Sequence, residues 1–267
     1  GSGKDRTCSS HQVCDTCYEH SHDFNWNVMS NVGDVRIDRI DRQGKDTPPR
    51  WSQATVGDPF AVSKTFTNYI KATPESLFNK SDIALAGKYQ IPAYPSEVYD
   101  YYRINRALAV GVNVPDLANW NADISNILRN LGPMKKANIV VIFTNNPAQN
   151  YANALNAAWL GGKKNDVIVV IGTPEYPKIE WVSVLSWSDN QLFKVTLRDS
   201  IYDVSEVKRP EIIAIINENV QKSFVKKSFK DFDYLQNDIQ LNDTAIYVII
   251  FLQLLFGVGI GFFIKQQ

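Results

Sequence analysis

Cysteine and histidine are scarce in this sequence, and neither occurs after residue 22. The 267 residues include three of each. A Ser-His-Asp triad within residues 23–267 is therefore excluded unless the N-terminal segment folds back onto the rest of the chain. The GxSxG, P-loop and GxGxxG patterns of hydrolases and nucleotide-binding enzymes are absent as well. We predict no catalytic residue, and these absences favour a non-enzymatic protein.

An excess of charge of one sign is also absent. The 28 lysines and arginines balance 28 aspartates and glutamates, so the net charge is zero. Many nucleic-acid-binding proteins derive their affinity from a strongly basic surface, which this composition does not provide. We therefore expect no nucleic acid among the partners.

All the cysteine and histidine lies in one short segment, "CSSHQVCDTCYEHSH", which covers residues 8–22. The candidate ligands are Cys8, His11, Cys14, Cys17, His20 and His22. Thiolates and imidazoles are the usual zinc ligands, and "CDTC" has the spacing of half a zinc site. In an oxidising compartment, two of the three cysteines would instead form a disulfide. The segment (residues 1–23) therefore predicts either zinc or a disulfide, with unstructured thiols as the remaining alternative.

The opposite end of the chain carries a long hydrophobic run, "TAIYVIIFLQLLFGVGIGFFI", at residues 244–264. Its 21 residues contain no charge, and as a helix they would be roughly 31 Å long. A buried core helix would show a polar face, so we expect one transmembrane helix, preceded by a linker at 237–243. Gly257 and Gly261 form a GxxxG pair, which favours packing against other spans, including that of a second copy. Glycine is, however, common in spanning helices.

The orientation of this span depends on indirect signals. Lys230 and Lys265 lie on its two sides, so the positive-inside rule gives almost no indication of the orientation. The chain begins with Gly1, which indicates either a cleaved signal peptide or a "GSG" cloning scar. A cleaved signal would place the N-terminal domains in the periplasm or outside the cell and the C-terminus in the cytoplasm. Without a signal, the same sequence would be a tail-anchored cytoplasmic protein.

The hydrophobic patterns divide the rest of the chain into two parts. Residues 24–112 alternate around an "NVGD" turn and contain many prolines, so we expect an irregular, β-rich region. From residue 113 onward, "ANIVVIFT" and "DVIVVIGT" predict two buried parallel strands, joined by a helix at "QNYANALNAAWL". We expect "KIEWVSVLSW" and "QLFKVTLRD" to be two more strands. Amphipathic helices precede and follow this group, the first ending at "LGP". These patterns predict an α/β fold with a sheet flanked by helices.

The order of these elements resembles the TPM domain, a family named after a thylakoid-lumen protein, a photosystem II repair factor and a nematode receptor modulator. The similarity covers residues 113–236 and does not reach the first 112 residues. It rests on topology and on Tyr151, Ala152, Trp159, Gly162, Asp166, Phe229, Asp233 and Tyr234. The resemblance implies an extracytoplasmic domain that is carried by one C-terminal span.

Some TPM proteins are described as phosphatases or calcium binders that use acidic loops. The corresponding candidates at the expected strand ends are Asp189, Asp199, Asp203 and Glu206. These carboxylates could bind a hard cation such as calcium, or only cap turns. We favour a membrane-anchored, non-enzymatic protein that assembles with or modulates an envelope protein or complex. The alternatives are a membrane-tethered metal-dependent phosphatase or other hydrolase, and a cytoplasmic tail-anchored zinc adaptor.

Overall fold

The computed structural model describes residues 25–30, 33–61, 68–73, 77–95, 100–102, 105–239 and 243–265. The predicted Cys/His segment lies outside these residues. The chain divides into two compact units, and the boundary in the sequence lies between Asp58 and Pro59. Each unit is described separately below.

The first unit contains a short β-hairpin. β1 (Trp26–Val28) pairs antiparallel with β2 (Val35–Ile37), which confirms the strand pair expected around "NVGD". A 3-10 helix, η1 (Pro49–Trp51), follows the hairpin. The Trp51 side chain is buried, and the guanidinium of Arg50 lies 4.7 Å from the centre of its ring.

The second unit is built on a four-stranded sheet with the order β3-β4-β5-β6. The parallel strands are β3 (Ala107–Val110), β4 (Asn138–Thr144) and β5 (Asp166–Gly172). β6 (Trp181–Leu185) pairs antiparallel with β5. β4 and β5 are buried on both faces, as their continuous apolar sequences predict. The predicted α/β class is confirmed, and the sheet also includes β3, which precedes residue 113.

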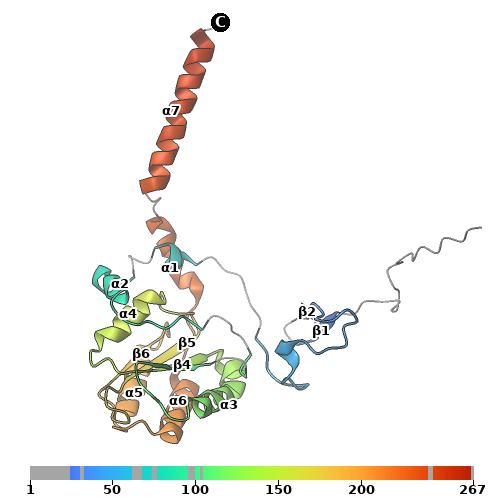
Figure 1. The fold of residues 1–267 in the computed structure, drawn as a ribbon, viewed down its shortest axis with the longest axis vertical. Helices are drawn as coiled ribbons and strands as arrows, with labels where there is room; N and C mark the ends of the chain where they lie inside the picture. Colours follow the sequence, from blue (N-terminus) through green and yellow to red (C-terminus); the bar gives the residue numbers. More distant parts are fainter. Residues whose placement is uncertain are drawn as a thin grey trace, which may run out of the picture. The chain divides into compact units, whose positions relative to one another are not determined.

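Helices cover both faces of this sheet (Figure 1). α3 (Leu117–Lys135), α5 (Gln191–Tyr202) and α6 (Arg209–Ser223) pack on the face that carries Val141. α4 (Asn150–Ala158) packs on the opposite face. The connections β3-α3-β4 and β4-α4-β5 each lead to the adjacent parallel strand, and both move across the sheet in the same direction. Because α3 and α4 lie on opposite faces, the two connections have opposite hands. One of them therefore departs from the usual right-handed rule.

Two predictions about individual elements are wrong. The segment "QLFKVTLRD" forms α5, not a strand. Phe193, Val195 and Leu197 alternate as in a strand, but Phe193 and Leu197 are buried in the helix while Val195 stays 43% exposed. α3 continues past "LGP" through Pro133 to Lys135, although proline has no N–H and leaves one helical hydrogen bond unmade in the last turns. The helix is closed by the Lys136 N–H, which bonds to the Gly132 carbonyl.

The segment before β3 is less strand-rich than the sequence predicts. It contains α1 (Tyr69–Ala72) and α2 (Lys80–Ala86), and both are short, as the frequent prolines lead one to expect. Residues beyond α2 pack on α4. The ring of Tyr94 lies 5.2 Å from that of Trp159, whose indole N–H donates to the Pro92 carbonyl at 2.9 Å.

Two helices complete the described chain. The 3-10 helix η3 (Phe229–Asp238) buries Phe232 and Leu235. α7 (Asp243–Lys265) follows, and its side chains are described as far as Gly257. No helix within the described residues is both long and apolar enough to cross a membrane, so the predicted span at 244–264 finds no support there.

Candidate functional site

The four acidic residues predicted as cation ligands are spread along and around α5. Asp189 precedes the helix, Asp199 lies in its last turns, Asp203 caps its end, and Glu206 follows. Three of them form ion pairs: Asp189 with Lys227 (2.6 Å), Asp199 with Arg198 (2.7 Å) and Glu206 with Lys208 (3.7 Å). Ten residues of mostly helical chain, about 15 Å, separate the first two carboxylates. The described residues contain no group of three metal-binding side chains able to hold an ion.

The remaining predicted site residues lie mostly beyond what the structure describes. This holds for Cys8, His11, Cys14, Cys17, His20 and His22, and for the surroundings of Gly261. Gly257 is described, and a Cβ added there would meet no described atom within 4 Å. The zinc, disulfide and GxxxG predictions therefore remain predictions.

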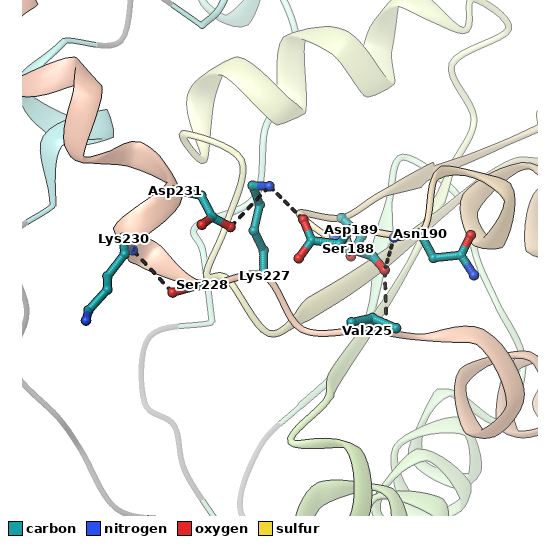
Figure 2. A network of polar contacts seen from close by, with 9 residues as sticks. Ser188, Asp189, Asn190, Val225, Lys227, Ser228, Lys230 and Asp231 are labelled. Atoms are coloured by element: carbon teal, nitrogen blue, oxygen red, sulfur yellow. Dashed lines mark hydrogen bonds and ion pairs between the residues drawn. The ribbon is translucent and has the colours of Figure 1, made fainter.

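Asp189 belongs to a polar network that the sequence did not predict. The network joins the start of α5 to the segment that leads toward α7 (Figure 2). Lys227 donates to Asp189 at 2.6 Å and lies 3.4 Å from Asp231 in the first turn of η3. The hydrogen bond to Asp189 raises the pKa of Lys227, and Asp231 adds to this effect. Such partly exposed ion pairs contribute only about 0–1 kcal/mol each, so this one chiefly orients η3.

Main-chain groups just before Lys227 are held by Ser188 and Asn190. The hydroxyl oxygen of Ser188, which is buried, accepts from the N–H groups of Asn190 and Val225, both at 3.3 Å (Figure 2). The Asn190 side chain caps α5 by accepting from the Phe193 N–H at 3.3 Å. It also donates to the Ser223 carbonyl at 3.1 Å, and thus links the start of α5 to the end of α6.

Trp187, next to this network, joins three separate segments. Its ring lies edge-on to Phe78 at 6.3 Å and to Phe232 of η3 at 4.9 Å. A Cβ added to Gly161, which has a φ of +74°, would lie 2.2 Å from the Trp187 ring. Only glycine leaves room for the ring at this position. Together, Trp187 and Lys227 attach η3 to the sheet domain, and we call the two contacts the η3 junction.

A second polar network lies at the amino ends of β4 and β5. Asp166, fully buried, accepts hydrogen bonds from the Tyr94 hydroxyl (2.7 Å), the Lys163 N–H (2.7 Å) and the Asn138 amide (3.0 Å). Burial raises the pKa of this carboxyl, and the hydrogen bonds oppose that shift. Asn138 in turn accepts from the guanidinium of Arg106 at 3.0 Å, and burial lowers the pKa of Arg106 to about 10.

The sequence does contain a signal for this second network. A polar residue stands immediately before each of the two apolar strand sequences, and the two residues, Asn138 and Asp166, are register partners in the sheet. Among the positions that carry the TPM resemblance, Asp166 therefore has a structural role. Tyr94 and Arg106 left no comparable signal, because they are far from Asp166 in sequence.

Comparisons of the chain with protein-family models, curated proteins and solved structures gave no match. The resemblance to the TPM domain therefore stays a prediction. The function of this protein is therefore inferred from its own residues.

Proposed function

We propose that this chain is a single-span membrane protein that presents its α/β domain outside the cytoplasm and assembles with or modulates another membrane or envelope protein. The uncharged run at residues 244–264 carries the proposal. α7 is helical over this run, and its large apolar side chains from Ile246 to Phe256 are 41–74% exposed. Exposed apolar area costs about 25 cal/mol per Å² in water, and lipid would remove that cost.

The η3 junction supports this proposal because it would hold the domain close to the bilayer. η3 ends at Asp238 and α7 begins at Asp243, so four residues separate the two helices. A fully extended chain would cover roughly 18 Å over that interval. Because Trp187 and Lys227 attach η3 to the sheet domain, the domain would have limited freedom above the membrane. Such restriction suits a protein that offers one surface to a neighbouring membrane protein.

The TPM resemblance over residues 113–236 agrees with this placement. Outside the cytoplasm, we favour a disulfide among Cys8, Cys14 and Cys17 over a zinc site. A metal-dependent hydrolase ranks lower, since Asp189 and Asp199 already pair with cations of the same chain. The hydrolase would require cleavage of a phosphate ester that depends on a divalent cation and is lost in Asp199→Ala.

The anchor can be tested by alkaline carbonate extraction of membranes that contain the full-length chain. We expect the chain to resist extraction and Leu254→Arg to be released, because arginine near the middle of a span costs about 2.5–3.5 kcal/mol on insertion scales. Leu192→Arg is the matched control, since Leu192 is similarly exposed but lies on α5. Release of the unaltered chain, or equal behaviour of the two variants, would contradict the anchor.

The orientation can be tested with protease added to intact cells. We expect the α/β domain to be digested while a tag placed after Gln267 is protected. Protection of the domain in intact cells, with its digestion only after permeabilisation, would establish the cytoplasmic tail-anchored alternative instead.

A further inference from the structure

Four loops lie side by side at the end of the sheet where β4 and β5 begin. The Asn138 N–H donates to the Asn165 carbonyl at 2.8 Å, which joins the turn before β4 to the turn before β5. The Ser186 hydroxyl donates to the Asp166 carbonyl at 2.7 Å and adds the segment after β6. The η3 junction adds the segment that follows α6. We call these loops the amino edge, and they cover residues 135–137, 159–165, 186–190 and 222–230.

The amino edge is basic, although the chain as a whole has no net charge. Its four loops contain eight lysines and a single acidic residue, Asp189. η3 adds three aspartates next to it, which halve this excess of charge and do not cancel it. The loops at the other end of the strands, residues 111–116, 145–149, 173–180 and 203–211, contain six acidic and three basic residues. The two edges of the sheet domain therefore carry opposite net charge.

Contacts within the chain neutralise only part of the amino edge. Lys227 pairs with two aspartates. Lys135 and Lys136 form no ion pair with any residue that the structure describes. Helix dipoles favour Lys135 and Lys222, which lie in the last turns of α3 and α6. The dipoles do not account for the lysines beyond those turns, so the amino edge suits an anion from outside the chain.

The chain leads from the amino edge to α7. η3 contacts this edge through Phe232 and continues for six residues to Asp238, about 12 Å at the rise of a 3-10 helix. The four residues before Asp243 add at most roughly 18 Å. This reach allows the amino edge to touch the bilayer that α7 would span, and it prevents the edge from moving far away.

We propose that the amino edge binds the bilayer surface through the anionic headgroups of its lipids. A lysine ammonium is a compact point charge that binds a phosphate without a fixed geometry. Lysines on four loops therefore suit a surface on which the negative charges move. The acidic edge would then point away from the membrane. The inference rests on the proposed span but not on its orientation, since either side of a bilayer can carry anionic lipids.

Anchoring favours a lipid surface over a soluble acidic partner. Each lysine close to an anionic surface strengthens the contact about fivefold. This attraction is lost beyond the Debye length, about 8 Å at physiological ionic strength. The span would keep the amino edge near the headgroups, so the effective concentration of the lipid surface stays high. A soluble partner would have to be captured without this advantage.

Energy transfer from the domain to the headgroups tests the contact in full-length chains. Cys8, Cys14 and Cys17 are replaced by serine, and a donor dye is attached to Asn130→Cys, an exposed position on the last turns of α3. The acceptor dye labels lipid headgroups in phosphatidylcholine vesicles with or without phosphatidylglycerol. We expect more efficient transfer with phosphatidylglycerol, and loss of this gain at high salt. A donor on Glu175→Cys, at the acidic edge, should show no comparable gain.

Two double variants separate the amino edge from charge in general. Lys135→Gln with Lys136→Gln should weaken the contact roughly 25-fold, about fivefold for each lysine. Lys178→Gln with Lys208→Gln removes the same charge from exposed positions at the acidic edge and should leave the transfer unchanged. Circular dichroism confirms that each variant is folded. Equal transfer in the two kinds of vesicle, or an equal loss in the two double variants, would overturn the inference.

Vesicle flotation in the same samples separates this inference from the proposed function. Chains that float with phosphatidylcholine vesicles but do not respond to phosphatidylglycerol would overturn the lipid contact and leave the anchor intact. Chains that do not float with phosphatidylcholine overturn the anchor, and capture by phosphatidylglycerol vesicles is then compared. Capture that is lost only in the Lys135 and Lys136 double variant would support the contact, whereas absence of capture would overturn it.

Discussion

Asp166 is an acidic side chain buried at the amino end of an apolar strand. A buried carboxylate is strongly disfavoured unless hydrogen bonds replace its hydration. Here three donors, from Tyr94, Lys163 and Asn138, surround the two carboxylate oxygens. The donors come from three parts of the chain, so this one side chain fixes the segment before β3 and the α4–β5 turn against the sheet.

We expect Asp166→Asn to destabilise the fold by about 1–3 kcal/mol, because the new amide group has no acceptor and displaces a donor. The folded-state pKa of Asp166 is raised above the unfolded value. The stability contributed by this carboxyl is therefore full below the unfolded pKa, near 4, and is lost as the pH rises through the folded pKa. The difference in the free energy of unfolding between the wild type and Asp166→Asn should thus grow as the pH falls from 7 toward 4.

Urea denaturation at several pH values measures this difference. The control is Asp233→Asn, an exposed aspartate in η3. A constant difference between wild type and Asp166→Asn across this range would show that the carboxyl does not titrate differently in the folded protein.

At the scale of single elements, η3 is held by contacts of unequal strength. Its aromatic contact, Phe232 against Trp187, depends on the close approach of Gly161 to the indole ring. The ion pair of Lys227 with Asp231 is partly exposed and contributes little. The packing of Trp187 should therefore determine how firmly η3 is attached.

We expect Gly161→Ala to accelerate amide hydrogen exchange in η3 by tenfold or more. The added methyl group would collide with the Trp187 ring at a position that already has a φ of +74°. Lys227→Met should have a smaller effect, about threefold, since it removes two partly exposed ion pairs and the contact of the ammonium with the Phe232 ring but leaves the Trp187 packing in place. Gly57→Ala is the control, because that glycine also has a positive φ but open space around it. A larger effect of Lys227→Met than of Gly161→Ala would contradict this ranking.

At the scale of the whole molecule, the sheet domain begins well before the segment that resembles the TPM domain. β3 is hydrogen-bonded to β4, and Arg106 and Tyr94 complete the network around Asp166. A chain that starts at residue 113 lacks all three. The compact unit begins instead at Pro59.

We therefore expect residues 59–238 to fold cooperatively and residues 113–238 to fail. The shorter chain would expose one edge of β4 and leave the carboxylate of Asp166 without the Tyr94 donor. Circular dichroism and urea denaturation of the two purified fragments check this. A cooperative transition in the shorter fragment would show that β3 and the preceding segment are dispensable.

Local patterns correctly predicted the elements that contribute most to the core. β4 and β5 have continuous apolar sequences, and α4 has an apolar face at helical spacing. Each pattern fits only one type of secondary structure. α5 was misassigned because Val195, on its exposed side, completes an alternating pattern with two buried residues. Asn190 before it was the available sign of a helix, since asparagine is a favoured N-cap.

The sequence by itself determined the α/β class, the two central strands, the N-terminal hairpin and the apolar C-terminal run, because each follows from the spacing of neighbouring side chains. Only the tertiary structure decided which distant residues meet. Tyr94 reaches Asp166 across 72 positions, and Lys227 reaches Asp189 across 38. Such contacts leave no periodic trace in the sequence. They depend on how strands and helices pack, and so the η3 junction and the addition of β3 to the sheet emerged only from the fold.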